Sequence, residues 1–263
     1  YAGPNPVYAI AIAPSGSASL ATYDSNLNPP STYPVLPSPV GGAACTAQTP
    51  FSITAADGLA GATIPAGINT NETLYMVRHA EAHPSSGWDD GNFVAAGQWR
   101  SLALPDVLRG KISPTDVYSI DPAQATNATD IIAGNPNFSY VRAALTVEPY
   151  AIANNLPYNL VSEFEMLDPN SPQLTSNRFF TGGAFSNRTV LLAWEHNHFP
   201  PIVTALLASY FPKGGGPTAP AWPGADYDTI WTVKLDATGN LTVDNALCEG
   251  IDSVKLPVTA PGF

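Results

Sequence analysis

An arginine and a histidine stand side by side at the end of a short apolar run, in the sequence TLYMVRHAEAHP of residues 73–84. Arg78 is one of only ten lysines and arginines among 263 residues, and His79 follows it directly. A guanidinium binds two oxygens of a phosphate group at once, because its donors form a planar fork. A neutral imidazole can attack a phosphoryl group and form a covalent intermediate. The pair could therefore bind a phosphate ester and begin to cleave it.

All four histidines of the chain fall into two short stretches. His79 and His83 lie in the first, and His196 and His198 lie in the sequence VLLAWEHNHFPP. A second histidine and a second arginine would stabilise the charge on the phosphoryl oxygens in the transition state. Arg142, in the sequence SYVRAALTVEPYA, is a candidate for that arginine. A carboxylic acid would be needed to protonate the leaving oxygen.

Four imidazoles could instead bind a metal ion, because imidazole is the commonest metal ligand. Pro84 argues against this, since a residue before proline avoids the helical conformation that would bring His83 onto the same face as His79. The charge of Arg78 would also oppose a nearby cation. We therefore expect no metal and no cofactor, and we expect His83 and His198 to contact the substrate or to lie at the edge of its pocket.

The composition indicates a globular protein whose net negative charge does not attract polyanions. The hydrophobic fraction is 44% and the formal net charge is -11. Nucleic acids and anionic membranes attract clustered Lys and Arg, so neither is an expected partner. No apolar run approaches the roughly 20 residues of a membrane span. We expect a monomer whose partner is a small phosphorylated substrate, held by a few well-placed cations.

Several features are typical of a secreted protein. The chain begins with Tyr1 and no charged leader precedes it, so we expect a processed, extracellular chain. Cys45 and Cys248 could form one long-range disulfide, worth roughly 4–5 kcal/mol in the chain-entropy model, and two buried free thiols are the alternative. Sequons for N-linked glycans occur at Asn71, Asn127, Asn137, Asn187 and Asn240.

Apolar patterns predict alternating strands and helices after residue 70. They predict strands over residues 73–78, 116–120, 156–161 and 189–196, and helices over residues 95–110, 139–155 and 201–211. Residues 227–245 read as a strand, a Gly-Asn turn and another strand. Pro149 should bend the second helix or mark its restart. Before these elements, residues 7–13 and 18–24 flank a turn-like Ser-Gly-Ser and predict a hairpin.

Strands that alternate with helices predict an α/β fold with three layers, α/β/α, and a mostly parallel central sheet. We expect the whole chain, residues 1–263, to form a single domain. Residues 1–70 would be an N-terminal arm or hairpin packed on a catalytic core of residues 71–263. Ligands of such sheets gather at the carboxyl ends of the strands, and both histidine stretches lie at such ends.

The stretch LYMVRHAE resembles the Arg-His-Gly signature of the histidine phosphatase superfamily, which includes phosphoglycerate mutases, acid phosphatases and phytases. Later segments resemble the family in the family's order: the helix AAGQWRSLAL, the strand VYS, the helix YVRAALTVEPYAIANNLP and the strand TVLLAWEHNH. The resemblance covers roughly residues 71–212 and implies the histidine phosphatase, or phosphoglycerate mutase-like, fold. The chain departs from the family at Ala80, where Gly is common, and in an insertion over residues 120–139.

Carried over residue by residue, the resemblance implies a phosphohistidine on His79. It implies that Arg78 and Arg142 clamp the phosphate and that His196 contacts its oxygens. The implied activity is hydrolysis of phosphomonoesters by a secreted enzyme. A catalytically weak or inactive secreted glycoprotein of the same fold, which binds an anionic ligand, is the alternative. A metallohydrolase is a third possibility.

The proton donor has no clear place in the sequence. The family pattern puts a glutamate where this chain has Met166, and Glu163 and Glu165 flank that position. Of these we favour Glu165. Glu81 and Glu195 are further candidates, although strand alternation would turn Glu195 to the opposite face from its neighbouring histidine. Without an acid, hydrolysis would be slow or confined to substrates with good leaving groups.

Overall fold

The computed structural model describes residues 6–12, 18–24, 47–82, 91–122, 140–161 and 171–261. The chain divides into two compact units, one of residues 1–34 with 262–263 and one of residues 35–261. In the first unit, strands β1 (Pro6–Ile12) and β2 (Ala18–Asp24) form an antiparallel hairpin, which confirms the two strands predicted there. The packing of this arm on the main body, and the single domain that it implied, stay predictions.

The second unit is built on a sheet of seven strands among its described residues, in the order β3-β9-β8-β4-β7-β5-β6. Strands β4, β7, β5 and β6 are parallel neighbours, and β8 pairs with β4 in the antiparallel sense. Since β9 is antiparallel to β8, five of the seven strands run in one direction, and the mostly parallel sheet is confirmed. The strands are β3 (Ser52–Ala55), β4 (Glu72–Arg78), β5 (Asp116–Ile120), β6 (Tyr158–Val161), β7 (Thr189–Trp194), β8 (Thr229–Leu235) and β9 (Leu241–Cys248).

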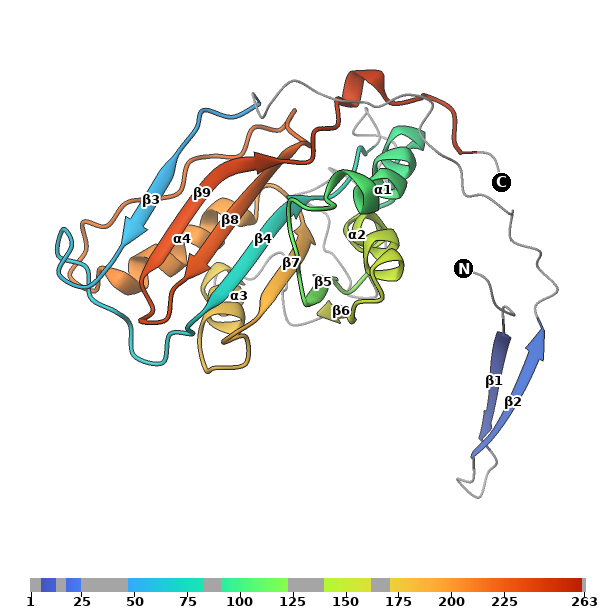
Figure 1. Ribbon diagram of the computed structural model, residues 1–263, viewed down its shortest axis with the longest axis horizontal. Helices are drawn as coiled ribbons and strands as arrows, with labels where there is room; N and C mark the ends of the chain where they lie inside the picture. Colours follow the sequence, from blue (N-terminus) through green and yellow to red (C-terminus); the bar gives the residue numbers. More distant parts are fainter. Residues whose placement is uncertain are drawn as a thin grey trace. The chain divides into compact units, whose positions relative to one another are not determined.

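Helices cover both faces of this sheet, as the three-layer prediction requires (Figure 1). Side chains alternate between the faces along a strand. In β4, Leu74 and Met76 belong to the apolar cluster that contains residues of α3 and α4, whereas Val77 belongs to the cluster of α1 and α2. The helices are α1 (Ala95–Val107), α2 (Arg142–Ala153), α3 (Ser171–Phe180) and α4 (Phe199–Tyr210). No helix of the described residues has both the length and the apolar character needed to cross a membrane.

Helix α2 continues through Pro149, where the sequence predicted a bend or a restart. Proline lacks the N–H that would bond the carbonyl four residues earlier, which is that of Leu145. The hydroxyl of Ser101, on the neighbouring helix α1, donates to this carbonyl instead. The carbonyl of Leu145 therefore keeps a hydrogen-bond partner inside the protein. The same hydrogen bond connects α1 to α2.

A buried cluster of charges holds the segment that follows β4. Arg100 of α1 is completely buried, and its guanidinium donates to both carboxylate oxygens of Glu81, at 2.7 to 3.0 Å. The same guanidinium donates to Glu249 and lies 3.8 Å from Asp228. Burial raises the pKa of Glu249 to about 8, although Arg100 opposes this, so the cluster carries fewer charges than its three carboxyls suggest. Glu81 is therefore tied to α1 and does not face His79 as an acid.

Replacement of Arg100 by Met should lower the free energy of unfolding by about 3–5 kcal/mol, because it leaves buried carboxylates without their counter-charge. Urea unfolding at neutral pH measures the loss. Arg109→Met is the matched control, since Arg109 and Asp106 are 78% and 72% exposed and their ion pair should contribute less than about 1 kcal/mol. Equal losses in the two variants would contradict the prediction.

Candidate active site

The parallel pairing of β4 and β7 brings the two histidine stretches together, as the sequence predicted. Arg78 pairs with Trp194 at the carboxyl ends of these strands. The next residue, His79, extends the pairing by donating its backbone N–H to the carbonyl oxygen of Trp194 at 2.9 Å. From the other side, the hydroxyl of Thr146 in α2 accepts the backbone N–H of Ala80 at 2.8 Å. The backbone around His79 is thus fixed by a strand and by a helix.

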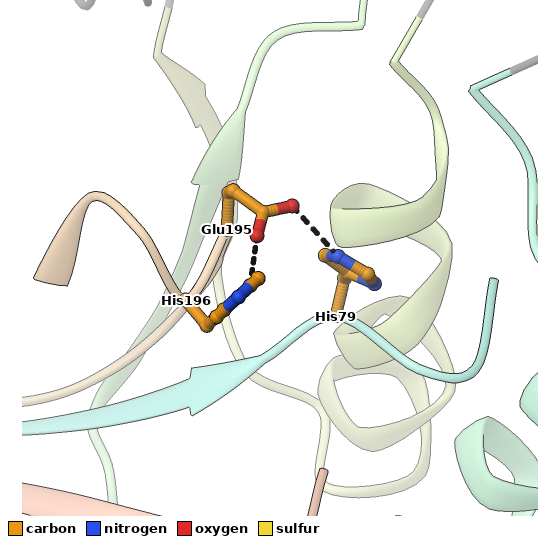
Figure 2. Close-up of side chains that lie close together, drawn as sticks. All are labelled: His79, Glu195 and His196. Carbon is orange, nitrogen blue, oxygen red and sulfur yellow. Dashed lines mark hydrogen bonds and ion pairs between the residues drawn. The ribbon is translucent and has the colours of Figure 1, made fainter. Parts of the chain in front are cut away.

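The ring of His79 is oriented by contacts on both nitrogens. Its Nδ1 lies 2.7 Å from the carbonyl oxygen of Ala80, and its Nε2 lies 2.9 Å from Oε2 of Glu195 (Figure 2). A carbonyl oxygen can only accept, so Nδ1 carries a proton. The contact between Nε2 and Oε2 then contains one further proton, which the imidazole and the carboxylate share. When this proton resides on the carboxyl group, Nε2 is unprotonated and its lone pair accepts the hydrogen bond.

Glu195 lies at the centre of the site and is only 7% exposed. Its Oε2 accepts the hydroxyl of Tyr140 at 2.6 Å, and its Oε1 faces Nδ1 of His196. Strand alternation suggested that Glu195 and His196 would point to opposite faces. That expectation does not hold, because β7 ends at Trp194 and both residues lie beyond the strand, where the backbone turns toward α4.

Two buried arginines lie beside His79. Arg78 is 6% exposed, donates to the carbonyl oxygen of Gly224 and lies with its guanidinium 3.8 Å from the centre of the Tyr227 ring. Arg142 is 3% exposed, begins α2, and lies 4.8 Å above the ring of Tyr140. The structure therefore brings Arg78, Arg142 and His196 together around His79, and the roles predicted for them stay predictions.

Sequence reasoning missed two tyrosines that flank His79. The rings of Tyr140 and Tyr227 meet the imidazole edge to face, with centroids 5.8 and 6.0 Å away. Tyr140 stands two residues before Arg142, which the sequence predicted to bind phosphate. This spacing was the one feature of the sequence that could have pointed to Tyr140. Tyr227 comes from the segment before β8, far from every motif. Only the antiparallel pairing of β8 with β4 brings it to the site.

Burial and neighbouring charges set the protonation of these groups. Burial lowers the pKa of His79, Glu195 opposes this, and Arg78 and Arg142 lower it further. Burial also lowers the pKa of Arg142 to about 10, so this arginine remains charged at neutral pH. Burial alone would raise the pKa of Glu195, but the charges and hydrogen bonds of His79 and His196 hold it below its usual range. The site thus combines an imidazole and a carboxyl group that share one proton with two cations.

For the other residues predicted from the sequence, the structure gives a position or nothing, and their predicted roles stay untested. His198 is the residue before the first turn of α4, and its ring stacks on that of Trp194 with the ring centroids 4.9 Å apart. Its predicted contact with substrate stays a prediction. His83, Glu163, Glu165 and Met166 lie outside the described residues, as do Cys45, Asn127 and Asn137. Cys248 ends β9 and is not a free thiol, and its bridge to Cys45 stays a prediction. Among the sequons, Asn71 and Asn187 are exposed and Asn240 is half-buried; their glycosylation stays a prediction.

Three side chains of the site could also hold a metal ion. The ligand atoms of His79, Glu195 and His196 all lie within 4.8 Å of one another. Their types suit a transition metal. However, Arg78 and Arg142 are close enough to shift the pKa of His79, and their charges would repel a cation in the same place. The two arginines favour an anion, and we interpret the cluster as an anion site.

Comparisons with known proteins found similar solved structures, whereas no protein-family model and no curated protein matches the chain. One neighbour is assigned as the phosphohistidine phosphatase SixA from Agrobacterium tumefaciens, with 16% identity, 62% of this chain and 92% of that chain covered, and a TM-score of 0.36. Another is the mycobacterial glucosyl-3-phosphoglycerate phosphatase Rv2419c, with 15% identity, coverages of 66% and 97%, and a TM-score of 0.34. A third is the phosphoglycerate mutase of Plasmodium falciparum, with 12% identity, coverages of 74% and 99%, and a TM-score of 0.38.

The stability of the protein should depend on pH through His198, whose pKa burial lowers from 6.5. Between the two pKa values the unfolded chain binds more protons than the folded one. The free energy of unfolding should therefore fall as the pH falls through 6.5 toward the lower pKa of the folded state. Urea unfolding at about pH 8 and about pH 5 measures this loss, which should be smaller in His198→Gln. A loss of the same size in the variant would contradict the prediction.

Proposed function

We propose that this protein hydrolyses phosphomonoesters through a phosphohistidine on His79. The observation that carries the proposal is the orientation of the His79 ring. Its Nδ1 is held by the carbonyl oxygen of Ala80, so that Nε2 faces the carboxyl group of Glu195, and two buried arginines lie close enough to lower the pKa of His79. Transfer of a phosphoryl group to nitrogen requires an unprotonated ring nitrogen, a proton for the leaving oxygen and cations that bind the phosphate.

In the first step, the shared proton moves from Nε2 of His79 to Oε2 of Glu195, across their contact of 2.9 Å. The lone pair of Nε2 forms a bond to phosphorus, and the bond from phosphorus to the ester oxygen breaks. Glu195 gives the proton to this leaving oxygen, which departs as an alcohol. The charges of Arg78 and Arg142, together with His196, stabilise the equatorial phosphoryl oxygens as the transition state forms.

In the second step, water attacks the phosphohistidine. The carboxylate of Glu195 takes a proton from the water as a bond forms between the water oxygen and phosphorus. The bond from phosphorus to Nε2 breaks and its electron pair returns to His79. Phosphate leaves, and the two residues again share one proton. One carboxyl group thus acts as acid and then as base, as microscopic reversibility allows.

The low pKa of Glu195 fits this scheme when the substrate's charge is included. A carboxyl group whose pKa lies below its usual range is a poor proton donor by itself. A phosphate ester brings about two negative charges into the site, and a like charge raises the pKa of a carboxyl group. Substrate binding would therefore favour transfer of the shared proton to Glu195, which leaves His79 as the nucleophile.

We propose Glu195, in place of Glu165, as the proton donor. Its contact with His79 favours an enzyme over the alternative, a protein of the same fold that only binds an anionic ligand. That alternative depended on Met166 in the place of the acid. A carboxyl group in contact with the attacking nitrogen supplies the missing function. The choice between enzyme and binder is then a question of chemistry that a trapping experiment answers.

Acid quenching after brief exposure to a ³²P-labelled aryl phosphate should trap label on His79. His79→Ala should trap none and should release no phosphate, since the nucleophile is gone, while its circular dichroism spectrum stays that of the unmodified protein. His198→Ala is the matched control and should still trap label, because His79 is intact. Undiminished phosphate release by a folded His79→Ala protein would sink the proposal, and binding of the ester without any label would identify the binding protein.

The acid role of Glu195 predicts a dependence on the leaving group. Glu195→Gln should lower kcat/KM for an alkyl phosphate by about 100-fold or more, because an alkoxide leaves poorly without a proton. For an aryl phosphate whose leaving group is itself acidic, the loss should be below about tenfold. Glu148→Gln, on α2, makes the same substitution away from His79 and should affect both substrates equally. Equal losses on both substrates in Glu195→Gln would contradict the role.

A further inference from the structure

Glu195 lies where the reacting phosphorus would have to lie. An imidazole attacks along the lone pair of its ring nitrogen, and reacting atoms approach to roughly 3–3.5 Å before the step. Oε2 of Glu195 is 2.9 Å from Nε2 of His79 and therefore occupies this position (Figure 2). The other ring nitrogen cannot replace Nε2, because Nδ1 is held by the carbonyl oxygen of Ala80. A phosphate group can reach Nε2 only when the carboxylate moves away.

The groups that hold Glu195 are the groups that a phosphate would use. The carboxylate contacts the imidazoles of His79 and His196, one on each oxygen. Burial lowers the pKa of Arg142, and the charge of Glu195 opposes this shift, because the two charges attract each other. The carboxylate is in effect an internal anion in the phosphate site. Phosphate and an ionised Glu195 would repel each other there, so they compete for one place.

One partner of Glu195 is not a cation or an imidazole. Tyr140 is completely buried, and its hydroxyl donates to Oε2 at 2.6 Å, the same oxygen that contacts His79. Burial, reinforced by the charge of Glu195, raises the pKa of Tyr140 well above its usual value, so the hydroxyl keeps its proton and remains a donor. The ring is fixed as well, because Arg142 lies over its face and His79 meets it edge to face.

We propose that Tyr140 is a positioning residue whose hydroxyl holds the carboxylate of Glu195 in the phosphoryl position, so that phosphate binding must break this hydrogen bond. The inference rests on the proposed function, because it assumes that phosphate binds against His79. When the bond breaks, the carboxyl group leaves the nucleophile and is available for the leaving oxygen. Tyr140 thereby couples binding of the phosphate to release of the acid.

Removal of the Tyr140 hydroxyl tests the proposal most directly, because the other groups around Glu195 carry or can carry charge. Every other described group near the carboxylate is itself charged or titratable, and its loss would change the field on phosphate directly. Loss of the Tyr140 hydroxyl removes a hydrogen bond and no charge. The groups concerned are Arg78 and His79 at the end of β4, Arg142 in α2, His196 and His198 after β7, and Tyr227 before β8.

The test is the affinity for inorganic phosphate at neutral pH, measured by isothermal titration calorimetry. Tyr140→Phe should bind phosphate about tenfold more tightly than the unmodified protein, the effect expected when one charge-assisted hydrogen bond no longer holds the competing carboxylate. Tyr210→Phe is the matched control, since it removes the hydroxyl of another completely buried tyrosine, which bonds the carbonyl oxygen of Gly239, and leaves the Tyr140 bond intact. Its affinity should change by less than about twofold.

A tighter complex is diagnostic, because damage to the site would weaken binding. Unchanged or weaker phosphate binding by Tyr140→Phe would overturn the inference. A second comparison keeps the test independent of folding: in a Glu195→Gln background, which already lacks the competing charge, Tyr140→Phe should gain less than about threefold. A full tenfold gain in that background would show that the hydroxyl does not act through Glu195, and would also overturn the inference.

The outcome is separate from that of the proposed hydrolysis. Tighter phosphate binding by Tyr140→Phe without label on His79 would support the positioning role and contradict the phosphatase. Label on His79 with unchanged phosphate binding would do the reverse. In an active enzyme, Tyr140→Phe should also lower KM for an aryl phosphate, whereas a merely structural defect would raise KM or lower kcat alone.

Discussion

The backbone hydrogen bond from His79 to Trp194 is the contact on which the site depends. It continues the parallel pairing of β4 and β7 one residue beyond the sheet, and so fixes where both chains leave it. Because of this register, His79 and Glu195 meet although 116 positions separate them. A slip by one residue would shift the two chains by about 3.3 Å relative to each other and separate this pair. The chemistry proposed for the pair therefore rests on strand pairing, which the apolar clusters on both faces secure.

Three of the few arginines of the chain are buried beside carboxylates or beside the proposed phosphate site. Arg100 neutralises the carboxylates behind the segment that follows β4, and Arg78 and Arg142 flank His79. Each of the last two lies over a tyrosine ring, which stabilises a guanidinium without neutralising it. Among the described residues, the carboxylate of Glu195 also reaches into this field, since its charge acts on both His79 and Arg142.

Most elements of the core could be predicted because their periodicity is strong. Strands such as β4, β5 and β7 are short apolar runs, and α1, α2 and α4 have apolar residues at helical spacing. Two elements were missed for opposite physical reasons. Helix α3, SPQLTSNRFF, is mostly polar and is stabilised by packing its final phenylalanines into the core. Strand β3 has only four residues and exists because β9 offers it an edge to pair with.

The sequence by itself determined the strand that ends at Arg78 beside His79, the helix that contains Arg142, and the carboxyl ends at which the strands should meet. These follow from local patterns and from the rule that parallel strands present their ends together. Tertiary structure alone decided the partners of His79: Glu195, which the strand pattern turned away, and the two tyrosines. The physical reason is that periodicity describes residues inside an element. Glu195 and Tyr227 lie just outside theirs, where the path of the backbone depends on the whole fold.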